Sequence, residues 1–307
     1  MMSAKILVTG GHGLVGYALQ QIAPQSTLFL NKKNGDLRNL ETVRQIFNQH
    51  QPEFVIHLAA KVAGVKTNAQ KKADMFTENV QINTNVLNVA QEYKVKKLVA
   101  VLSNCVFQEN PPRIPTEEDI HQQMPFHGHL GYGYAKRMMD LQIHLLQEQY
   151  GCQFTSITPV TIIGPNDNWD FNESHVAGSL IQKCYLAKKN NTPLEVWGTG
   201  NAIRQFVSSH DIAHILLNVI KDYHEPSTLI VAPDQETSIR QLAETIAKIF
   251  EFKGEIIFDA TKPEGELKRI LDNRKFKNIF PSFQFMSLEK SLQSAMDWYL
   301  KNIAPSI

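Results

Sequence analysis

The first half of the chain alternates short apolar runs with stretches in which apolar residues recur every three or four positions. A short apolar run bounded by polar residues is typical of a buried strand, and the longer spacing is typical of a helix that packs one face on a sheet. Alternating strands and helices predict a parallel sheet, because parallel strands need crossover connections. The predicted strands cover residues 5–8, 27–30, 54–58, 97–102 and 154–157. The first predicted helix begins at Leu14, and three further helices cover residues 40–49, 79–93 and 138–150.

Beyond residue 160 the alternation is looser, although no linker separates the two parts. Helices are predicted at 176–188, 211–223, 239–250 and 288–300, with short strands at 194–196, 229–231 and 255–258. We therefore predict an α/β fold: a Rossmann-type, doubly wound parallel sheet in residues 1–160 and a smaller C-terminal α/β substrate lobe in residues 161–307, with some of the chain returning to the sheet.

A glycine-rich run, TGGHGLVG at residues 9–16, lies between the first strand and the first helix. In that context Gly11 and Gly13 are expected to allow a tight turn close to a pyrophosphate, and Gly16 to let the helix pack on the strand. The helix N-terminus adds free N–H groups and the positive end of its dipole. The run predicts a dinucleotide site made of Gly10, Gly11, His12, Gly13, Leu14, Val15 and Gly16.

The end of the second strand decides which dinucleotide fits. An acid there binds the ribose 2′-OH of NAD, whereas Asn31, Lys32 and Lys33 would attract the 2′-phosphate of NADP. Asp36 is a rival acid, or a contact to the adenine, beyond a predicted Asn-Gly turn. His12 could also reach the phosphate. We predict NADP(H) as the cofactor.

Ser103 follows the fourth strand, and Tyr132 and Lys136 form a Y-x-x-x-K motif. Residues four apart on a helix share one face, and an ammonium beside a phenol is expected to bring its pKa from about 10 toward neutrality. Such a tyrosine can donate a proton to a carbonyl oxygen as hydride arrives, while Ser103 binds the same oxygen. These residues predict a carbonyl reductase.

Composition narrows the classes of protein further. The net charge of +1 indicates no general affinity for nucleic acid or anionic membranes. No apolar stretch has the length of a membrane span, about 18 residues or more, and the N-terminus does not resemble a signal peptide. The three cysteines lie far apart, without metal-ligand spacing, which favours a reducing compartment. We predict a cytoplasmic enzyme without a metal.

Several stretches, spread over nearly the whole chain, resemble extended short-chain dehydrogenases and, among them, the GDP-L-fucose synthase family. They are TGGHGLVG at 9–16, HLAA at 57–60, LSNCVF at 102–107, YGYAKRMMD at 132–140, GPNDN at 164–168, SHV at 174–176, and VWGTG at 196–200 with RQF at 204–206.

The resemblance implies the conversion of GDP-4-keto-6-deoxy-mannose to GDP-L-fucose. Epimerisation at C3 and C5 precedes reduction of the C4 ketone with NADPH, and the resemblance assigns an acid/base pair to Cys105 and His175. A carbon next to a ketone is acidic because its anion is an enolate, and inversion needs a base on one face and an acid on the other. Taken by themselves, Cys105 also fits a small buried hydrophobe and His175 a solvent-facing residue at a helix start.

The resemblance also implies further contacts and a homodimer formed through the helices after strands three and four. The implied cofactor contacts are Leu37, Leu58, Ala59, Ala60, Pro159 and His175, besides Tyr132 and Lys136. The implied substrate contacts are Asn104, Thr161, Lys183, Trp197, Arg204, Lys268 and Arg269. The cationic side chains of Arg204, Lys268 and Arg269 suit a diphosphate. Trp197 either lines the sugar pocket or packs under the lobe.

Some positions depart from the family pattern. Thr161 and Ile163 stand where the family usually has an asparagine and an aromatic residue, and Ile203 replaces a basic residue. Three functions therefore remain: the bifunctional epimerase–reductase, a related enzyme that reduces or epimerises another GDP-sugar such as a 6-deoxy-heptose, and a non-catalytic NADP-binding sensor.

Overall fold

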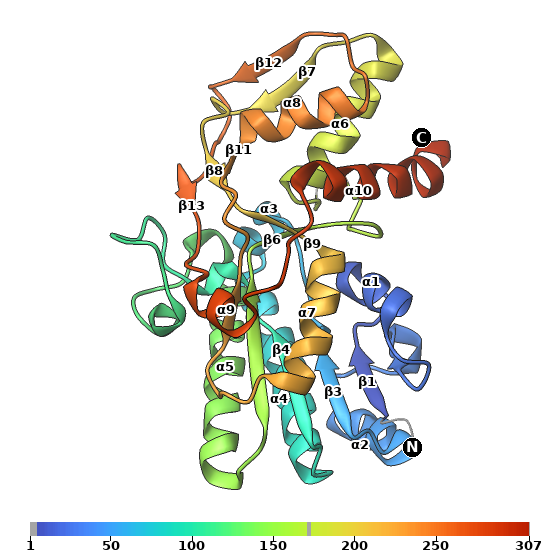
Figure 1. Ribbon diagram of the computed structural model, residues 1–307, viewed down its shortest axis with the longest axis vertical. Coiled ribbons are helices and arrows are strands. Elements are labelled where there is room, and N and C mark those ends of the chain that lie inside the picture. Colours follow the sequence, from blue (N-terminus) through green and yellow to red (C-terminus); the bar gives the residue numbers. More distant parts are fainter. Residues whose placement is uncertain (1–4, 171–172, 307) are drawn as a thin grey trace.

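A six-stranded parallel sheet forms the centre of the protein, in a computed structural model that describes residues 5–170 and 173–306. Its strands lie in the order β10-β5-β4-β3-β1-β2 (Figure 1). Their bounds are Ile6–Thr9 for β1, Leu28–Phe29 for β2, Phe54–His57 for β3, Lys97–Val101 for β4, Phe154–Pro159 for β5 and Leu229–Val231 for β10. The order reverses between β1 and β3, so the predicted doubly wound sheet is confirmed.

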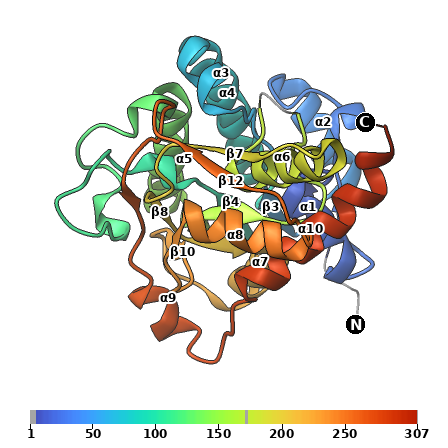
Figure 2. The ribbon, with the colours of Figure 1, turned by 90° about the horizontal axis from the view of Figure 1, so that it is seen from above.

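Helices cover both faces of this sheet. Helix α1 packs on α7, while α4 packs between α2 and α5. Figure 2 shows α2 and α4 on one side of the strands and α7 on the other. The helix bounds are Leu14–Ile22 for α1, Leu40–His50 for α2, Val65–Gln70 for α3, Lys72–Glu92 for α4, Leu130–Tyr150 for α5 and Ser209–Asp222 for α7.

A second apolar core lies in the lobe drawn above the sheet in Figure 1. Two strand pairs, β7–β12 and β6–β9, and the small sheet β11-β8-β13 shape this lobe. Helix α9 (Arg274–Ile279) instead returns to pack on β10. The other bounds are Thr161–Ile163 (β6), Val176–Asn190 (α6), Leu194–Trp197 (β7), Ile203–Arg204 (β8), Phe206–Ser208 (β9), Thr237–Ser238 (β11), Ile239–Ile249 (α8), Ile256–Asp259 (β12), Lys268–Arg269 (β13) and Leu288–Asn302 (α10).

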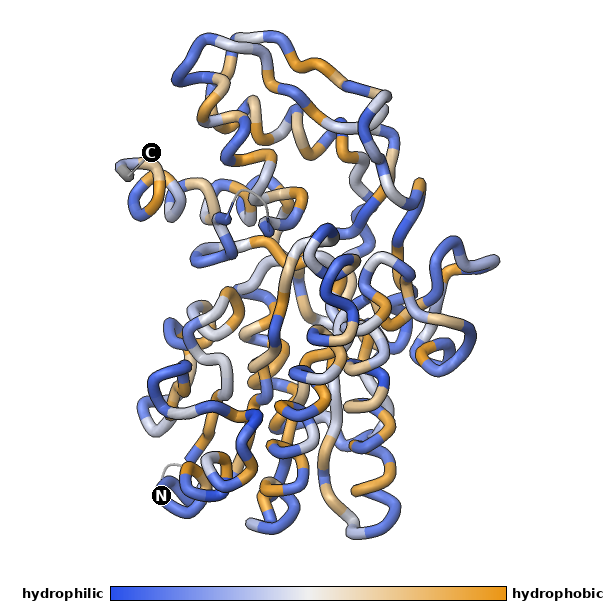
Figure 3. Tube along the Cα trace, turned by 180° about the vertical axis from the view of Figure 1, so that it is seen from behind, coloured by the Kyte–Doolittle hydropathy of each residue, from blue (hydrophilic) through white to orange (hydrophobic). Residues whose placement is uncertain are grey.

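The chain passes between the two cores more than once, since α7 and β10 belong to the first core and α8 to the second. The boundary at residue 160 stays a prediction. Figure 3 shows hydrophobic residues concentrated along the strands and helices, whereas many connecting loops are hydrophilic. No helix within residues 5–170 and 173–306 is long and apolar enough to cross a membrane.

Two helices begin earlier than the apolar spacing predicts. Helix α5 starts at Leu130 rather than at 138, and α4 starts at Lys72 rather than at 79. The first turns of α5 contain Gly131, where a Cβ would lie 2.1 Å from the carbonyl oxygen of Lys72. The two helix starts therefore pack backbone to backbone, and this contact leaves no apolar stripe in the sequence.

Candidate active site

The glycine loop turns at the end of β1 and leads into α1. Gly10 has a φ of 65°, and a Cβ on it would lie 2.8 Å from the backbone nitrogen of Ala59. A Cβ on Gly16 would lie 2.4 Å from the carbonyl oxygen of Gly11, so α1 packs directly on the loop, as predicted. The tight turn falls at Gly10 rather than at Gly11 or Gly13, because Gly10 has the left-handed backbone.

The first turn of α1 is open toward a ligand. Gly13 precedes the helix without a side-chain cap, and a Cβ there would meet nothing closer than 3.5 Å. Leu14 and Val15 form the first turn, whose N–H groups have no partner within the helix. This geometry fits an anionic pyrophosphate.

The turn after β2 fits a 2′-phosphate. Asn31 accepts a hydrogen bond from the backbone N–H of Lys33 at 2.8 Å and so fixes a short 3-10 helix at Lys32–Asn34. Both lysines are exposed, and neither forms an ion pair within the described part of the chain. His12 is exposed at the glycine loop, where its carbonyl oxygen accepts a bond of 2.9 Å from the Asn166 side chain.

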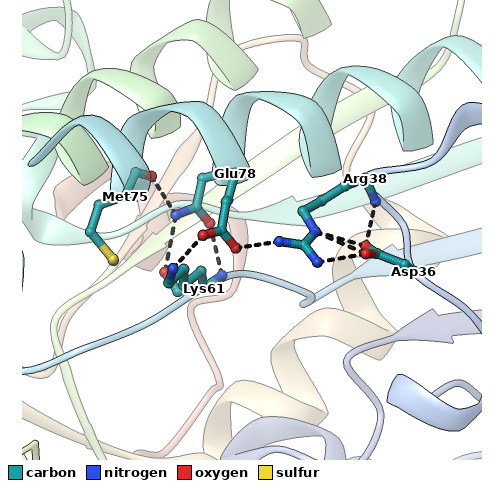
Figure 4. A network of polar contacts seen from close by, with 6 residues as sticks. Asp36, Arg38, Lys61, Met75 and Glu78 are labelled. Carbon is teal, nitrogen blue, oxygen red and sulfur yellow. Dashed lines mark hydrogen bonds and ion pairs between the residues drawn. The ribbon is translucent and has the colours of Figure 1, made fainter. Parts of the chain in front are cut away.

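Asp36 belongs to a chain of charges drawn in Figure 4. Its carboxylate accepts hydrogen bonds from Nε and Nη2 of Arg38 at 3.0 and 2.6 Å, and these bonds lower its pKa. Nη1 of Arg38 contacts Glu78 at 2.9 Å, and Glu78 also pairs with Lys61. This engagement argues against Asp36 as the ribose-binding acid of an NAD site. Its neighbour Leu37 is half-buried and packs against the main core.

Residues at the carboxyl ends of β3 and β5 complete the predicted cofactor site. Thr9 Oγ1 accepts hydrogen bonds of 3.2 Å from the backbone N–H groups of both Leu58 and Ala59. Ala60 is half-buried beside them and packs against the cluster that contains Cys105 and Tyr132. Pro159 is buried at the end of β5, beside β10.

Ser103 and Cys105 are joined directly after β4. Ser103 begins a 3-10 helix at Asn104–Val106, and Cys105 Sγ donates to Ser103 Oγ at 3.1 Å. Burial raises the pKa of the Cys105 thiol, and the bond to Ser103 and the cations of Arg269 and Lys136 oppose that rise. Cys105 is therefore buried and also hydrogen-bonded to a serine hydroxyl at the end of a strand. Asn104 is half-buried in the same turn.

Tyr132 and Lys136 share one face of α5, as predicted. Tyr132 is in the same buried cluster as Cys105, and Lys136 Nζ lies 5.6 Å from the centroid of the Tyr132 ring. Lys136 Nζ donates to the carbonyl oxygen of Val101 at 2.7 Å, so the helix is fastened to the end of β4. Ser103, Cys105, Tyr132 and Lys136 thus converge at one edge of the sheet.

The pKa of Tyr132 differs from the expectation. Burial raises the pKa of its phenol, and the nearby Cys105 adds to the rise, whereas burial lowers the pKa of Lys136 to about 8. The ammonium does not bring the tyrosine toward neutrality because both groups are desolvated and the ammonium is held by a backbone carbonyl. A protonated phenol remains the form that donates a proton to a ketone.

His175 directly precedes α6, makes no capping hydrogen bond with its side chain, and is exposed. It lies near Asp167 and near His129, since its charge affects the pKa of both. His129 precedes α5, and burial, with the cations of Arg269 and His175, lowers its pKa to about 4. Asp167, which lies in the GPNDN stretch, and His129 are thus the ionisable neighbours of His175. The signal in the sequence for His129 is its spacing, three positions before Tyr132.

The predicted diphosphate contacts separate into two groups. Arg204 and Arg269 lie on neighbouring strands, β8 and β13, and both are largely buried. Lys268 faces the opposite way, is exposed and pairs with Glu236 at 2.7 Å. The structure therefore does not bring Lys268 into the site beside Arg269, because adjacent strand residues alternate in direction.

The remaining predicted substrate residues lie on the lobe and on β6. Lys183 Nζ stands 4.8 Å from the centroid of the Trp197 ring, which is 52% exposed. Trp197 is therefore at the surface rather than packed under the lobe. Thr161 is half-buried on β6, where it pairs with Phe206 on β9. Within the described residues, no cluster of histidine, cysteine and acidic side chains has the geometry of a metal site.

Comparison with known proteins agrees with this arrangement. The model of the NAD dependent epimerase/dehydratase family matches residues 6–232. A GDP-L-fucose synthase of Dictyostelium discoideum is 38% identical over 97% of this chain and 95% of its own. A crystal structure of a GDP-L-fucose synthetase from Naegleria fowleri bound to NADP is 36% identical, with a TM-score of 0.94 over 99% of this chain and 95% of its own.

A more distant structure, a GDP-6-OMe-4-keto-L-xylo-heptose reductase from C. jejuni, shares the fold at 23% identity, with a TM-score of 0.89 over 98% of this chain and 99% of its own. The chain belongs to the NAD dependent epimerase/dehydratase family and, within it, to the GDP-L-fucose synthases.

Proposed function

We propose that this protein is an NADP(H)-dependent epimerase–reductase that converts GDP-4-keto-6-deoxy-D-mannose to GDP-L-fucose. The observation that carries the proposal is the convergence of Ser103, Cys105, Tyr132 and Lys136 at the edge of the sheet where the glycine loop also lies. Ligands of such sheets bind outside the carboxyl ends of the strands, at the point where the strand order reverses.

Epimerisation uses the side of the site that carries Cys105. The thiolate of Cys105 removes the proton from the carbon next to the ketone, and His175 returns a proton to the opposite face. Ser103 and Tyr132 donate hydrogen bonds to the ketone oxygen, and the negative charge of the enolate develops there. Because burial raises the pKa of Cys105, the nearby cations of Arg269 and Lys136 are needed to make its thiolate accessible.

Reduction uses the same oxygen. The reduced cofactor, when bound, supplies hydride to C4. Tyr132 gives its phenolic proton to the C4 oxygen, and Lys136 stabilises the phenolate that this transfer leaves. The ammonium of Lys136 stays beside Tyr132 because it donates a hydrogen bond to the carbonyl oxygen of Val101. One pair of hydroxyl donors therefore serves both reactions.

A related GDP-sugar is the second candidate substrate. Thr161 lies half-buried on β6, close to the ends of the central strands, and its short hydroxyl leaves more room than the amide found in the family. This favours a larger sugar, such as a 6-deoxy-heptose. Cys105 held against Ser103 favours the bifunctional reaction over reduction alone.

We also propose a homodimer, and a cytoplasmic enzyme in keeping with its free cysteines. Helix α5 presents four apolar side chains at spacings of three and four residues. Tyr134, Met138, Leu141 and Leu145 are 37%, 44%, 49% and 51% exposed, respectively. Such a stripe matches a helix seam that a second copy would cover. Sedimentation of the protein should give a dimer, and Leu141→Lys with Leu145→Lys should give a monomer; a wild-type monomer would refute the dimer.

The function is tested by steady-state kinetics with matched substrates. GDP-4-keto-6-deoxy-mannose, a GDP-4-keto-6-deoxy-heptose and the corresponding UDP-keto-sugar are each supplied with NADPH or NADH. We expect the highest kcat/KM with the GDP-hexose and NADPH, and GDP-L-fucose as the product. Preference for the heptose would establish the second candidate, and tight NADPH binding without turnover of any sugar would indicate a sensor.

A further inference from the structure

Glu266 is a buried acid that the reaction does not use. Its side chain is 2% exposed, and it precedes β13 in the substrate lobe. The preceding residue, Gly265, has a φ of 76°, so a left-handed turn aims Glu266 into the protein. A buried carboxylate is costly unless its oxygens are paired, so its partners indicate what it holds.

One carboxylate oxygen of Glu266 holds Arg269. The distance from Glu266 Oε2 to Nε of Arg269 is 2.7 Å. The guanidinium also lies 4.0 Å from the centroid of the Phe126 ring, while its Nη2 is buried and has no hydrogen-bond partner among the described residues. Glu266 and Phe126 thus fix the orientation of a guanidinium whose Nη2 keeps its N–H donors for a ligand.

The other oxygen of Glu266 holds a loop of the sheet domain. Oε1 accepts a hydrogen bond of 2.8 Å from the backbone N–H of Asn110, five residues after Cys105. The backbone carbonyl of Glu266 accepts a bond of 2.8 Å from Nη1 of Arg204. In Figure 1 this loop lies beside β13, at the left of the molecule. One residue therefore contacts both arginines of the predicted diphosphate site and the segment that carries the thiol.

We propose that Glu266 is the positioning residue of the diphosphate site, which orients Arg269 and Arg204 toward the substrate and ties them to the loop that follows Cys105. This inference rests on the proposed GDP-sugar substrate. It deepens that proposal by naming the residue that orients the arginines. Without Glu266 the two like-charged guanidinium groups would repel each other and turn toward bulk solvent. Glu266 itself does not touch the substrate.

The direction in which one substitution changes the affinity for GDP distinguishes a positioning role of Glu266 from a purely electrostatic one. Glu266→Gln removes a negative charge beside a diphosphate, so a charge argument predicts tighter binding of GDP. Positioning predicts the opposite, because an amide has one acceptor oxygen and cannot hold both Arg269 and the Asn110 N–H. We expect the Kd of GDP, measured by calorimetry, to rise about tenfold, while the Kd of NADPH changes by less than about twofold.

Two further variants calibrate that result. Glu266→Asp keeps the charge with a shorter reach, so it should recover part of the affinity for GDP. Glu236→Gln removes the acid that pairs with the neighbouring, exposed Lys268, and it should leave GDP binding unchanged or slightly tighter. A role of Glu266 in folding alone would instead weaken NADPH and GDP binding together and lower Tm.

Hydrogen exchange tests the same contact in the unchanged protein, whether or not the variants fold. The exposed Asn110 should have a protected amide, because its N–H donates to Glu266. Equal GDP affinity in Glu266→Gln and wild type, or an Asn110 amide that exchanges like an open loop, would overturn the assignment. Failure of the wild-type protein to bind GDP would instead overturn the proposed function on which it rests.

Discussion

The cofactor side of the site is built mainly of backbone at the ends of four- to six-residue parallel strands, whereas the substrate side is built of long charged side chains on two-residue strands. At Gly10 and Gly16 the chain approaches itself so closely that a single methyl group does not fit. Around Arg204 and Arg269 the geometry depends instead on ion pairs and hydrogen bonds to Glu266. Substitutions on the cofactor side should therefore reduce binding through steric clash with the backbone. Substitutions on the substrate side should reduce binding through loss of an ion pair or hydrogen bond.

The largest effect is expected where the two sides meet. Tyr132→Phe removes the proton donor and should lower the rate of ketone reduction by about 10³-fold, while NADPH affinity stays nearly unchanged. The reduced-nicotinamide absorbance gives the rate, and fluorescence titration gives the affinity. Tyr134→Phe is the matched control, since Tyr134 is exposed and has no lysine four residues later. Equal losses in both variants would remove Tyr132 from the chemistry.

Cys105→Ser should affect proton exchange more than cofactor binding. A serine hydroxyl stays protonated at neutral pH and is a much weaker base than a thiolate, so deuterium exchange at C3 and C5 should slow by about 100-fold or more. Cys152→Ser, at a half-buried free cysteine, serves as the control. Undiminished exchange in the Cys105 variant would show that another group removes the proton.

A pair of glycine substitutions tests the steric contrast directly. Gly16→Ala places a Cβ 2.4 Å from backbone, and it should destabilise the fold by about 2–3 kcal/mol and weaken NADPH binding. Gly178→Ala, in helix α6 of the lobe, places a Cβ no closer than 3.6 Å to any described residue and should be neutral or stabilise by up to about 1 kcal/mol. Urea unfolding measures both. Similar changes in the two variants would contradict the contrast.

The positive charges after β2 should have a smaller effect on cofactor binding. Replacing both Lys32 and Lys33 by alanine should raise the Kd of NADPH by about tenfold and leave that of NADH nearly constant, because NADH has no 2′-phosphate to attract them. Equal weakening for both cofactors would indicate that the lysines act on the loop rather than on the phosphate.

The smallest effect concerns pH, where the two reactions should diverge. Burial lowers the pKa of Lys136 to about 8, so reduction should fall as pH rises through that value and the ammonium is lost. Burial raises the pKa of Cys105, so exchange at C3 and C5 should increase as pH rises and the thiolate forms. Parallel pH profiles for reduction and exchange would contradict the separate roles.

The same contrast explains what the sequence predicts. The separate strands and helices, the glycine loop and the Tyr132/Lys136 pair follow from local spacing, because each depends on neighbours within a few residues. Local spacing does not reveal Glu266, since Asn110, whose N–H it binds, lies 156 residues away. The sequence predicts Lys268 and Arg269 as a pair of substrate contacts because strand β13, which turns their side chains in opposite directions, is too short to leave a pattern.

The central claim is that a single oxygen-binding pair, Ser103 and Tyr132, serves both proton exchange and reduction. The most direct measurement is the position of deuterium in the product formed from GDP-4-keto-6-deoxy-mannose and NADPH in deuterated water, determined by NMR. The account predicts deuterium on the sugar carbons C3 and C5 and ordinary hydrogen at C4. A reduced product that retains ordinary hydrogen at C3 and C5 would contradict it.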